Sequence, residues 1–76
     1  MAKFNVKLNT FTDVKVFCDR VCKVKGPVDL SHGRYCIDAK SIQGIYALDL
    51  SNVLVAECRD EDAATLAEAI KDWRVD

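Results

Sequence analysis

The sequence predicts an α+β fold: a four-stranded antiparallel sheet with three helices on one face, in the chain order βαββαβα. Two patterns lead to this prediction. Four short runs alternate polar and apolar residues, as strands with one wet face do, and three runs carry apolar residues three and four positions apart, as amphipathic helices do. With 76 residues, of which 50% are hydrophobic, the chain predicts a single domain over residues 1–76 with one core.

The first strand and the first helix are predicted at the start of the chain. Residues 3–8 alternate polar and apolar side chains, which indicates a half-buried strand. A helix follows, with Thr12 or Asp13 as the expected N-cap. Gly26 and Pro27 are expected to end it, because glycine suits the C′ position and proline cannot continue a helix. Its apolar face is expected to contain Val14, Phe17, Cys18, Val21 and Val24.

A β-hairpin is predicted in the middle of the chain. Residues 28–31 and 35–39 each alternate in the manner of a strand. His32 and Gly33 between them suit a two-residue turn with positive φ at both positions. Because antiparallel hairpins with one apolar face need a covering layer, this pattern favours a sheet with helices on one side and water on the other.

The second half of the chain predicts two helices around a last strand. Ser41 starts a short helical stretch in which Ile45 and Leu48 are expected to face the core. Residues 53–58 form a β-rich run. Residues 59–62 then open a helix with acidic side chains in its first turn, where the helix dipole favours them. Its buried stripe is expected to contain Ala63, Leu66, Ala67, Ile70 and Trp73. Across the elements, one shared core is expected from Phe17, Val21, Ile37, Leu48 and Ile70.

Charge and hydropathy exclude several classes of partner. The formal net charge is −1, so no excess of basic residues is available for nucleic acid or an acidic membrane. No apolar run approaches the length of roughly 18 residues that a membrane span needs. Residues 1–7 alternate and contain no apolar region typical of a signal peptide. A cytoplasmic location is therefore expected.

The four cysteines are expected to be reduced and free of metal. Cys18 and Cys22 are the only close pair, whereas Cys36 and Cys58 stand alone, and a structural zinc site needs two close pairs. A disulfide scaffold belongs to exported proteins, and no export signal is present. His32, the only histidine, is far along the chain from the close pair. Neither a metal nor any other cofactor is expected.

No arrangement of residues predicts an enzyme. A catalytic nucleophile needs a base within hydrogen-bond reach, and the sequence gives none of its cysteines an evident base. No glycine-rich phosphate loop is present. His32 could accept a phosphoryl group or a metal, but a histidine in a turn is more often a turn residue alone.

The stretch from Asp38 to Leu50 is the most informative part of the sequence. It contains the run Ala39-Lys40-Ser41-Ile42-Gln43-Gly44-Ile45. This run resembles the start of the second helix in HPr proteins, the small phosphocarriers of the bacterial sugar phosphotransferase system. The resemblance extends over residues 14 to about 51, and the predicted order of elements agrees with it. It implies an HPr-like open-faced β-sandwich.

One segment departs from the HPr pattern. HPr proteins carry Gly-x-His-x-Arg-Pro between the first strand and the first helix, and this histidine carries the phosphoryl group. Residues 8–14 here contain no His, Arg or Pro, and the connection is shorter. Thr10 and Thr12 would form phosphate esters without the transfer potential of phosphohistidine, and Asp13 would repel phosphate. The resemblance is thus to a divergent member without carrier activity, similar to the catabolite-repression paralogue of HPr.

The resemblance implies a regulatory role for Ser41. In HPr proteins of Gram-positive type, the matching serine is phosphorylated by an HPr kinase, and the product binds a LacI-type regulator. Lys40, Ile42 and Tyr46 next to it form the expected partner-binding surface. The plainer interpretation of Ser41 is a helix cap alone. Two other functions stay open: a phosphocarrier using another residue such as His32, or a scaffold or oligomerisation subunit.

Overall fold

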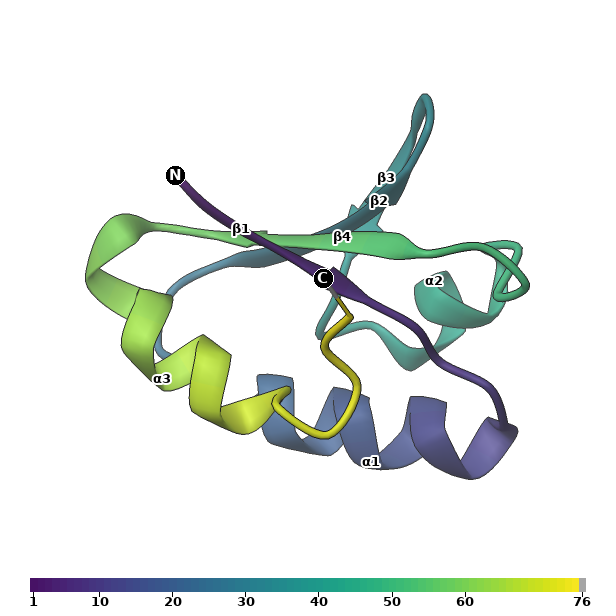
Figure 1. The fold of residues 1–76 in the computed structure, drawn as a ribbon, viewed down its shortest axis with the longest axis horizontal. Helices are drawn as coiled ribbons and strands as arrows, with labels where there is room; N and C mark the ends of the chain where they lie inside the picture. Colours follow the sequence, from purple (N-terminus) through teal and green to yellow (C-terminus); the bar gives the residue numbers. More distant parts are fainter. Residues whose placement is uncertain (76) are drawn as a thin grey trace.

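The computed structural model describes residues 1–75, and it confirms the predicted α+β fold with the order βαββαβα (Figure 1). A turn of 3-10 helix at Asp60–Asp62 leads into the last helix. The described residues form a four-stranded sheet in the order β1-β4-β2-β3, with all neighbours antiparallel. The elements are β1 (Ala2–Val6), α1 (Phe11–Val21), β2 (Val28–His32), β3 (Tyr35–Asp38), α2 (Ile42–Tyr46), β4 (Leu54–Cys58) and α3 (Ala63–Ala69).

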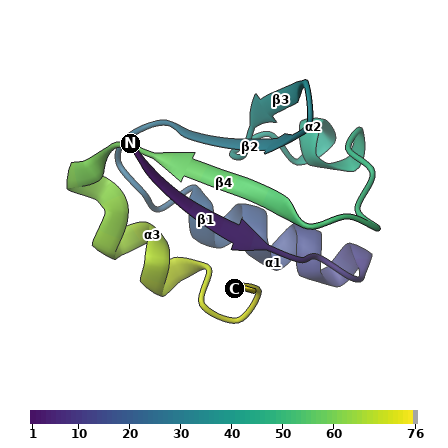
Figure 2. The same cartoon turned by 45° about the horizontal axis from the view of Figure 1, so that its top comes forward.

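The helices lie on one side of the sheet and leave its other face open. Figure 1 shows α1 and α3 below the strands, with α2 below the opposite end of the sheet. In Figure 2, β3 forms one edge of the sheet and α2 lies beside it. Along β4 the helix-facing residues Leu54, Ala56 and Cys58 are buried, whereas Val55 and Glu57 are partly exposed. This alternation is what a sheet with one wet face requires.

The core lies between the sheet and the helices, largely as predicted. All five expected residues of the α1 face are buried, and Phe17 meets Trp73 edge-on with 5.6 Å between ring centroids. Leu48 and Ile70 are buried as expected. Ile37 is only partly buried, so its predicted place in the core is wrong. The reason is that β3 is an edge strand and pairs with β2 alone.

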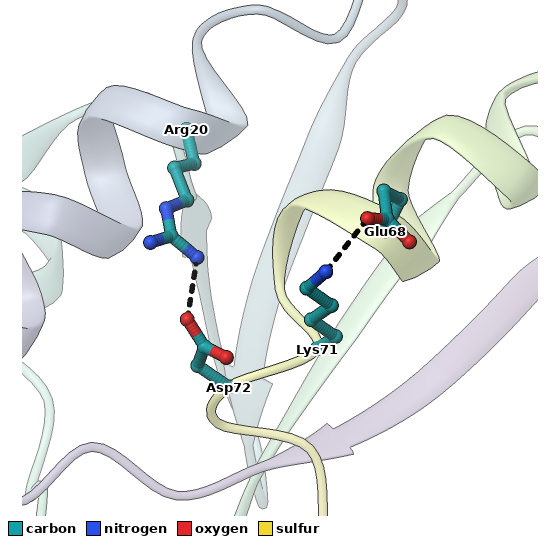
Figure 3. A network of polar contacts seen from close by, with 4 residues as sticks. All are labelled: Arg20, Glu68, Lys71 and Asp72. Atoms are coloured by element: carbon teal, nitrogen blue, oxygen red, sulfur yellow. Dashed lines mark hydrogen bonds and ion pairs between the residues drawn. The ribbon is translucent and has the colours of Figure 1, made fainter.

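One surface ion pair links α1 to the turn after α3, and a second lies within the end of α3 and that turn (Figure 3). Arg20 and Asp72 approach to 2.8 Å, and the Arg20 guanidinium also lies 4.9 Å from the ring centroid of Trp73. Lys71 pairs with Glu68 at 2.8 Å on the neighbouring turn. Because these side chains are at least a third exposed, each pair contributes little, at most about 1 kcal/mol.

The N-cap of α1 is Thr10, so the predicted cap at Thr12 or Asp13 is wrong. The Thr10 hydroxyl accepts a hydrogen bond from the backbone N–H of Asp13 at 3.0 Å. The Asp13 carboxylate accepts in return from the N–H groups of Asn9 and Thr10, at 3.0 and 3.3 Å. This reciprocal capping box needs the acid three residues after the cap, which places Thr10, and not its neighbours, at the start.

Gly26 does not occupy the C′ position of α1, in contrast to the prediction. The helix ends at Val21, with Cys22 as C-cap. Gly26 is buried and has no positive φ. A Cβ at this position would overlap Asp62 and Arg59 side-chain atoms. The glycine therefore permits a close approach between the α1–β2 connection and the residues just before α3.

The β2–β3 turn is one residue later than predicted. His32 belongs to β2 and pairs with Tyr35, which leaves Gly33 and Arg34 as the turn residues. Gly33 has φ of 59°, and no residue other than glycine has a positive φ within residues 1–75. A positive φ at the first turn residue alone is the pattern of a type II′ hairpin, so glycine is needed there and His32 stays in the strand.

The end of the described chain lies along the free edge of β1. The N–H of Val75 donates to the Asn5 carbonyl and the N–H of Lys7 to the Trp73 carbonyl, both at 2.9 Å. Val6 and Arg74 form the bridge between these segments. This pairing covers part of an edge that would otherwise expose unpaired backbone groups. In the part of the chain described, none of the helices has the length and apolar character needed to span a bilayer.

Candidate functional site

Ser41 lies exposed immediately before α2, where its hydroxyl caps the helix as predicted. The hydroxyl accepts from the N–H of Gly44 at 3.4 Å, and the backbone at Ser41 is extended. The N–H of Ser41 donates to the Asp38 carbonyl at 2.9 Å, and its carbonyl accepts from Ile45 at 3.1 Å. The backbone of Ser41 is thus fixed on both sides, while its hydroxyl faces solvent.

Lys40 joins the start of α2 to the end of α1. Its ammonium donates to the Val24 carbonyl at 2.6 Å, and its N–H donates to an Asp38 carboxylate oxygen at 2.9 Å. Its own carbonyl accepts from the thiols of Cys18 and Cys22. Lys40 therefore has a structural role here, and its ammonium must leave the Val24 carbonyl before it can meet a partner or a phosphate.

An exposed aromatic pair lies between α1 and α2. The rings of Phe11 and Tyr46 meet edge-on, with 5.6 Å between centroids. Phe11 is 76% exposed and Tyr46 is 43% exposed, while Ile42 on the same helix is partly buried against the core. Together with Ser41 these residues form what we call the α1–α2 surface.

Sequence reasoning missed Phe11 as part of this surface. It placed Phe11 in the connection before the helix, whereas the structure makes it the first residue of α1. The contact with Tyr46 is tertiary, so no local spacing predicts it. The available signal was a large apolar side chain among polar neighbours, in a position outside the buried stripe of the helix.

By the resemblance to HPr proteins, a carrier histidine would be expected near the start of α1, where this chain has Asp13 and no histidine. Hydrogen bonds from backbone N–H groups, that of Asn9 above all, hold the pKa of Asp13 below its ordinary value. The carboxylate is therefore charged at neutral pH. Because it accepts from the N–H groups of Asn9 and Thr10, it takes donors that a phosphate would use and adds charge repulsion.

His32 lies beside a different carboxylate. His32, Tyr35 and Asp49 line one shallow pocket with the end of α2. The hydroxyl and N–H of Ser51 donate to Asp49 at 2.6 and 3.0 Å. These bonds lower the pKa of Asp49, and the charge of His32 contributes in the same direction. The pocket thus presents an ionised acid to the imidazole, which disfavours a phosphoryl group there.

The four cysteines are free thiols of two kinds. Cys22 and Cys36 are exposed, whereas Cys18 and Cys58 are buried. Burial, with a further contribution from Cys22, raises the pKa of Cys18 to about 11. Burial also raises the pKa of Cys58. Because the thiolate is the reactive form, neither buried cysteine is a nucleophile at neutral pH.

Comparison with known proteins relates this fold to one class. No family model matches the chain, and no curated protein matches it. Among solved structures, the crystal structure of HPr-C-His from Thermoanaerobacter tengcongensis is similar, with 25% sequence identity and a TM-score of 0.71. The match covers 95% of this chain and 93% of that one.

This similarity assigns the chain to one class of fold, that of HPr. The chain has the HPr-like fold, with the order βαββαβα and a four-stranded antiparallel sheet.

Proposed function

We propose that this chain is a non-catalytic, HPr-like regulatory or protein-interaction module of the bacterial cytoplasm that has lost histidine phosphocarrier activity. The α1–α2 surface binds its protein partner, and phosphorylation of Ser41 regulates the binding. The observation that carries the proposal is the aromatic pair of Phe11 and Tyr46, which is exposed on two helices, the second of which is capped by the exposed Ser41. Large aromatic side chains at a surface are favoured anchors of protein interfaces.

The loss of carrier activity rests on the N-terminus of α1. Phosphoryl transfer needs an imidazole nucleophile together with donors that stabilise the transferred charge. Residues 8–14 contain no histidine, and the capping box occupies the backbone donors of Asn9 and Thr10. The alternative carrier, His32, shares its pocket with the ionised Asp49. The N-terminus of α1 and the pocket at His32 are therefore both poor acceptors of a phosphoryl group.

The regulatory step rests on Ser41 and its neighbours. A phosphate there adds a charge of about −1.5 to −2 at neutral pH. It would lie beside the apolar side chains of Ile42 and Tyr46, which makes a mixed anionic and apolar surface. An arginine-bearing partner recognises such a surface through charge-assisted hydrogen bonds. The partners we propose are an HPr kinase, which modifies Ser41, and a LacI-type regulator, which binds the product.

The experiment has two stages with purified proteins. A Gram-positive-type HPr kinase is incubated with the wild type and with Ser41→Ala, and intact mass is measured. We expect one phosphoryl group on the wild type and none on the variant. No phosphate on the wild type would leave Ser41 as a helix cap. Sedimentation would then test the scaffold alternative.

The second stage measures binding of the phosphorylated protein to a LacI-type regulator. Phe11→Ala and Tyr46→Ala should each weaken the binding, because each removes one ring of the aromatic pair. The matched control is Tyr35→Ala, since Tyr35 is 67% exposed but lies on β3, outside the α1–α2 surface. Equal loss for Tyr35→Ala and Tyr46→Ala would contradict the proposed surface.

A further inference from the structure

The thiols of Cys18 and Cys22 both lie near the carbonyl oxygen of Lys40, between α1 and the start of α2. Cys18 and Cys22 are four residues apart, so they lie on the same face of α1 on successive turns. The Cys18 sulfur lies 3.5 Å from the Lys40 carbonyl oxygen, and the Cys22 sulfur lies 3.8 Å from the same oxygen. Cys18 is buried and Cys22 is exposed, so solvent reaches the pair from the Cys22 side.

The spacing of the two cysteines disfavours a disulfide. Residues on successive helical turns have Cβ atoms about 5–6 Å apart, whereas a disulfide needs about 3.5–4.5 Å. A metal ion bonded to both sulfurs allows a larger separation between the two side chains than a disulfide does. With metal–sulfur bonds of about 2.3 Å, two sulfurs can be up to about 4.6 Å apart, which side chains on successive turns reach by rotation alone.

The number of ligands decides which ion fits. Within residues 1–75, no group of three or more His, Cys, Asp or Glu side chains is placed to hold a metal. Zinc prefers four protein ligands in a structural site, and two sulfurs alone do not supply them. Thiolates are soft ligands that select copper(I), and copper(I) is stable with two thiolates in a linear arrangement.

We infer that Cys18 and Cys22 form a two-thiolate binding site for copper(I) at the seam between α1 and α2. On binding, two S–H bonds break, two copper–sulfur bonds form and two protons pass to solvent, and no electron is transferred. The ion would lie beside the Lys40 carbonyl, one residue before Ser41. This inference does not depend on the proposed function.

The test is a titration with copper(I) under argon, kept reduced with ascorbate and held by the coloured chelator bicinchoninate. The wild type is expected to withdraw one copper per chain from the chelator and to gain the ultraviolet absorption of a copper–thiolate bond. Cys22→Ser should lose both signals. This variant changes an exposed residue at the end of α1, so the core stays intact, and circular dichroism checks the fold.

Cys36→Ser is the matched control, because Cys36 is an exposed thiol without a neighbouring cysteine on its strand. It should bind copper as the wild type does. Absence of binding by the wild type would overturn the inference, and so would full binding by Cys22→Ser. Loss of binding in Cys36→Ser would also overturn it, since the copper would then bridge two chains.

Discussion

Replacing Gly26 with alanine tests the packing between the α1–β2 connection and the residues just before α3. Gly26 is buried and lacks a positive φ, so its backbone conformation is open to alanine. Such a replacement normally stabilises a protein by about 0.4–1 kcal/mol through the entropy of the unfolded chain. Here the added Cβ would overlap the Asp62 carboxylate and the Arg59 guanidinium. The structure therefore predicts the opposite sign.

The size of the effect follows from the contact that must break. Arg59 Nε donates to Asp62 Oδ2 at 2.9 Å, and the Asp62 side chain is 11% exposed. To admit the methyl group, both side-chain ends must shift, and we predict that this shift breaks the hydrogen bond between them and leaves a mostly buried carboxylate without its partner. Loss of a hydrogen bond to a charged group costs about 1.5–3 kcal/mol. That is a large share of the roughly 4–11 kcal/mol expected for a domain of this size.

Urea unfolding followed by circular dichroism measures this cost. After the entropic gain of about 0.4–1 kcal/mol is subtracted, the net cost is about 0.5–2.6 kcal/mol. With a slope of about 1 kcal/mol per molar urea, Gly26→Ala should lower the midpoint by roughly 0.5–2.6 M. The control is Gly26→Ala in an Asp62→Ala background, where the methyl group meets no carboxylate and most of the cost should vanish. A midpoint for Gly26→Ala at or above that of the wild type would refute the reasoning.

Four further predictions concern the core, the cap of α1 and the thiols. Phe17→Ala should destabilise the fold by about 3–5 kcal/mol, because Phe17 is fully buried against Trp73; an unchanged urea midpoint would show that the α1 face is misassigned. Thr10→Ala should cost about 0.5–2 kcal/mol as the loss of an N-cap, measured in the same way, and Thr12→Ala, at an exposed position inside the helix, should cost less. Because the folded-state pKa of Asp13 lies below its ordinary value of 3.8, its stabilisation is present above about pH 4 and is lost as pH falls through the folded pKa. Asp13→Asn should therefore be less stable than the wild type at pH 7, and the two should converge in acid; a constant difference would contradict this. Finally, Cys22 and Cys36 should react quickly with an aromatic disulfide reagent and Cys18 and Cys58 slowly, since the latter are buried with raised pKa values; four equal rates would contradict the burial.

The fold was predictable because its elements carry strong periodic signals. The buried face of α1 repeats with the period of a helix, and β4 alternates with the period of a strand, so their orientations follow from sequence alone. Ile37 was placed wrongly because alternation gives the face of a strand but not whether the strand lies at the edge. The role of Gly26 was missed because its constraint comes from Arg59 and Asp62, far along the chain.

The candidate site was predictable only in part, because local rules give its helix cap but not its contacts between distant segments. Ser41 as a cap follows from a local rule about helix starts. The pairing of Phe11 with Tyr46 depends on how α1 packs beside α2, and the approach of Cys18 and Cys22 to the Lys40 carbonyl depends on the path of the chain before α2. Lys40 in turn donates to the Val24 carbonyl, a partner that no spacing indicates.

Phosphoryl transfer from phosphoenolpyruvate and enzyme I tests the central claim most directly. The protein is incubated with both, beside an authentic HPr as positive control, and intact mass is measured at neutral pH and after brief acid treatment. We predict that HPr gains an acid-labile phosphoryl group and that this chain gains none, because Asp13 occupies the N-terminus of α1 and Asp49 lies beside His32. An acid-labile phosphoryl group on this chain, lost on replacing His32 with alanine, would contradict the account and identify the protein as an active carrier.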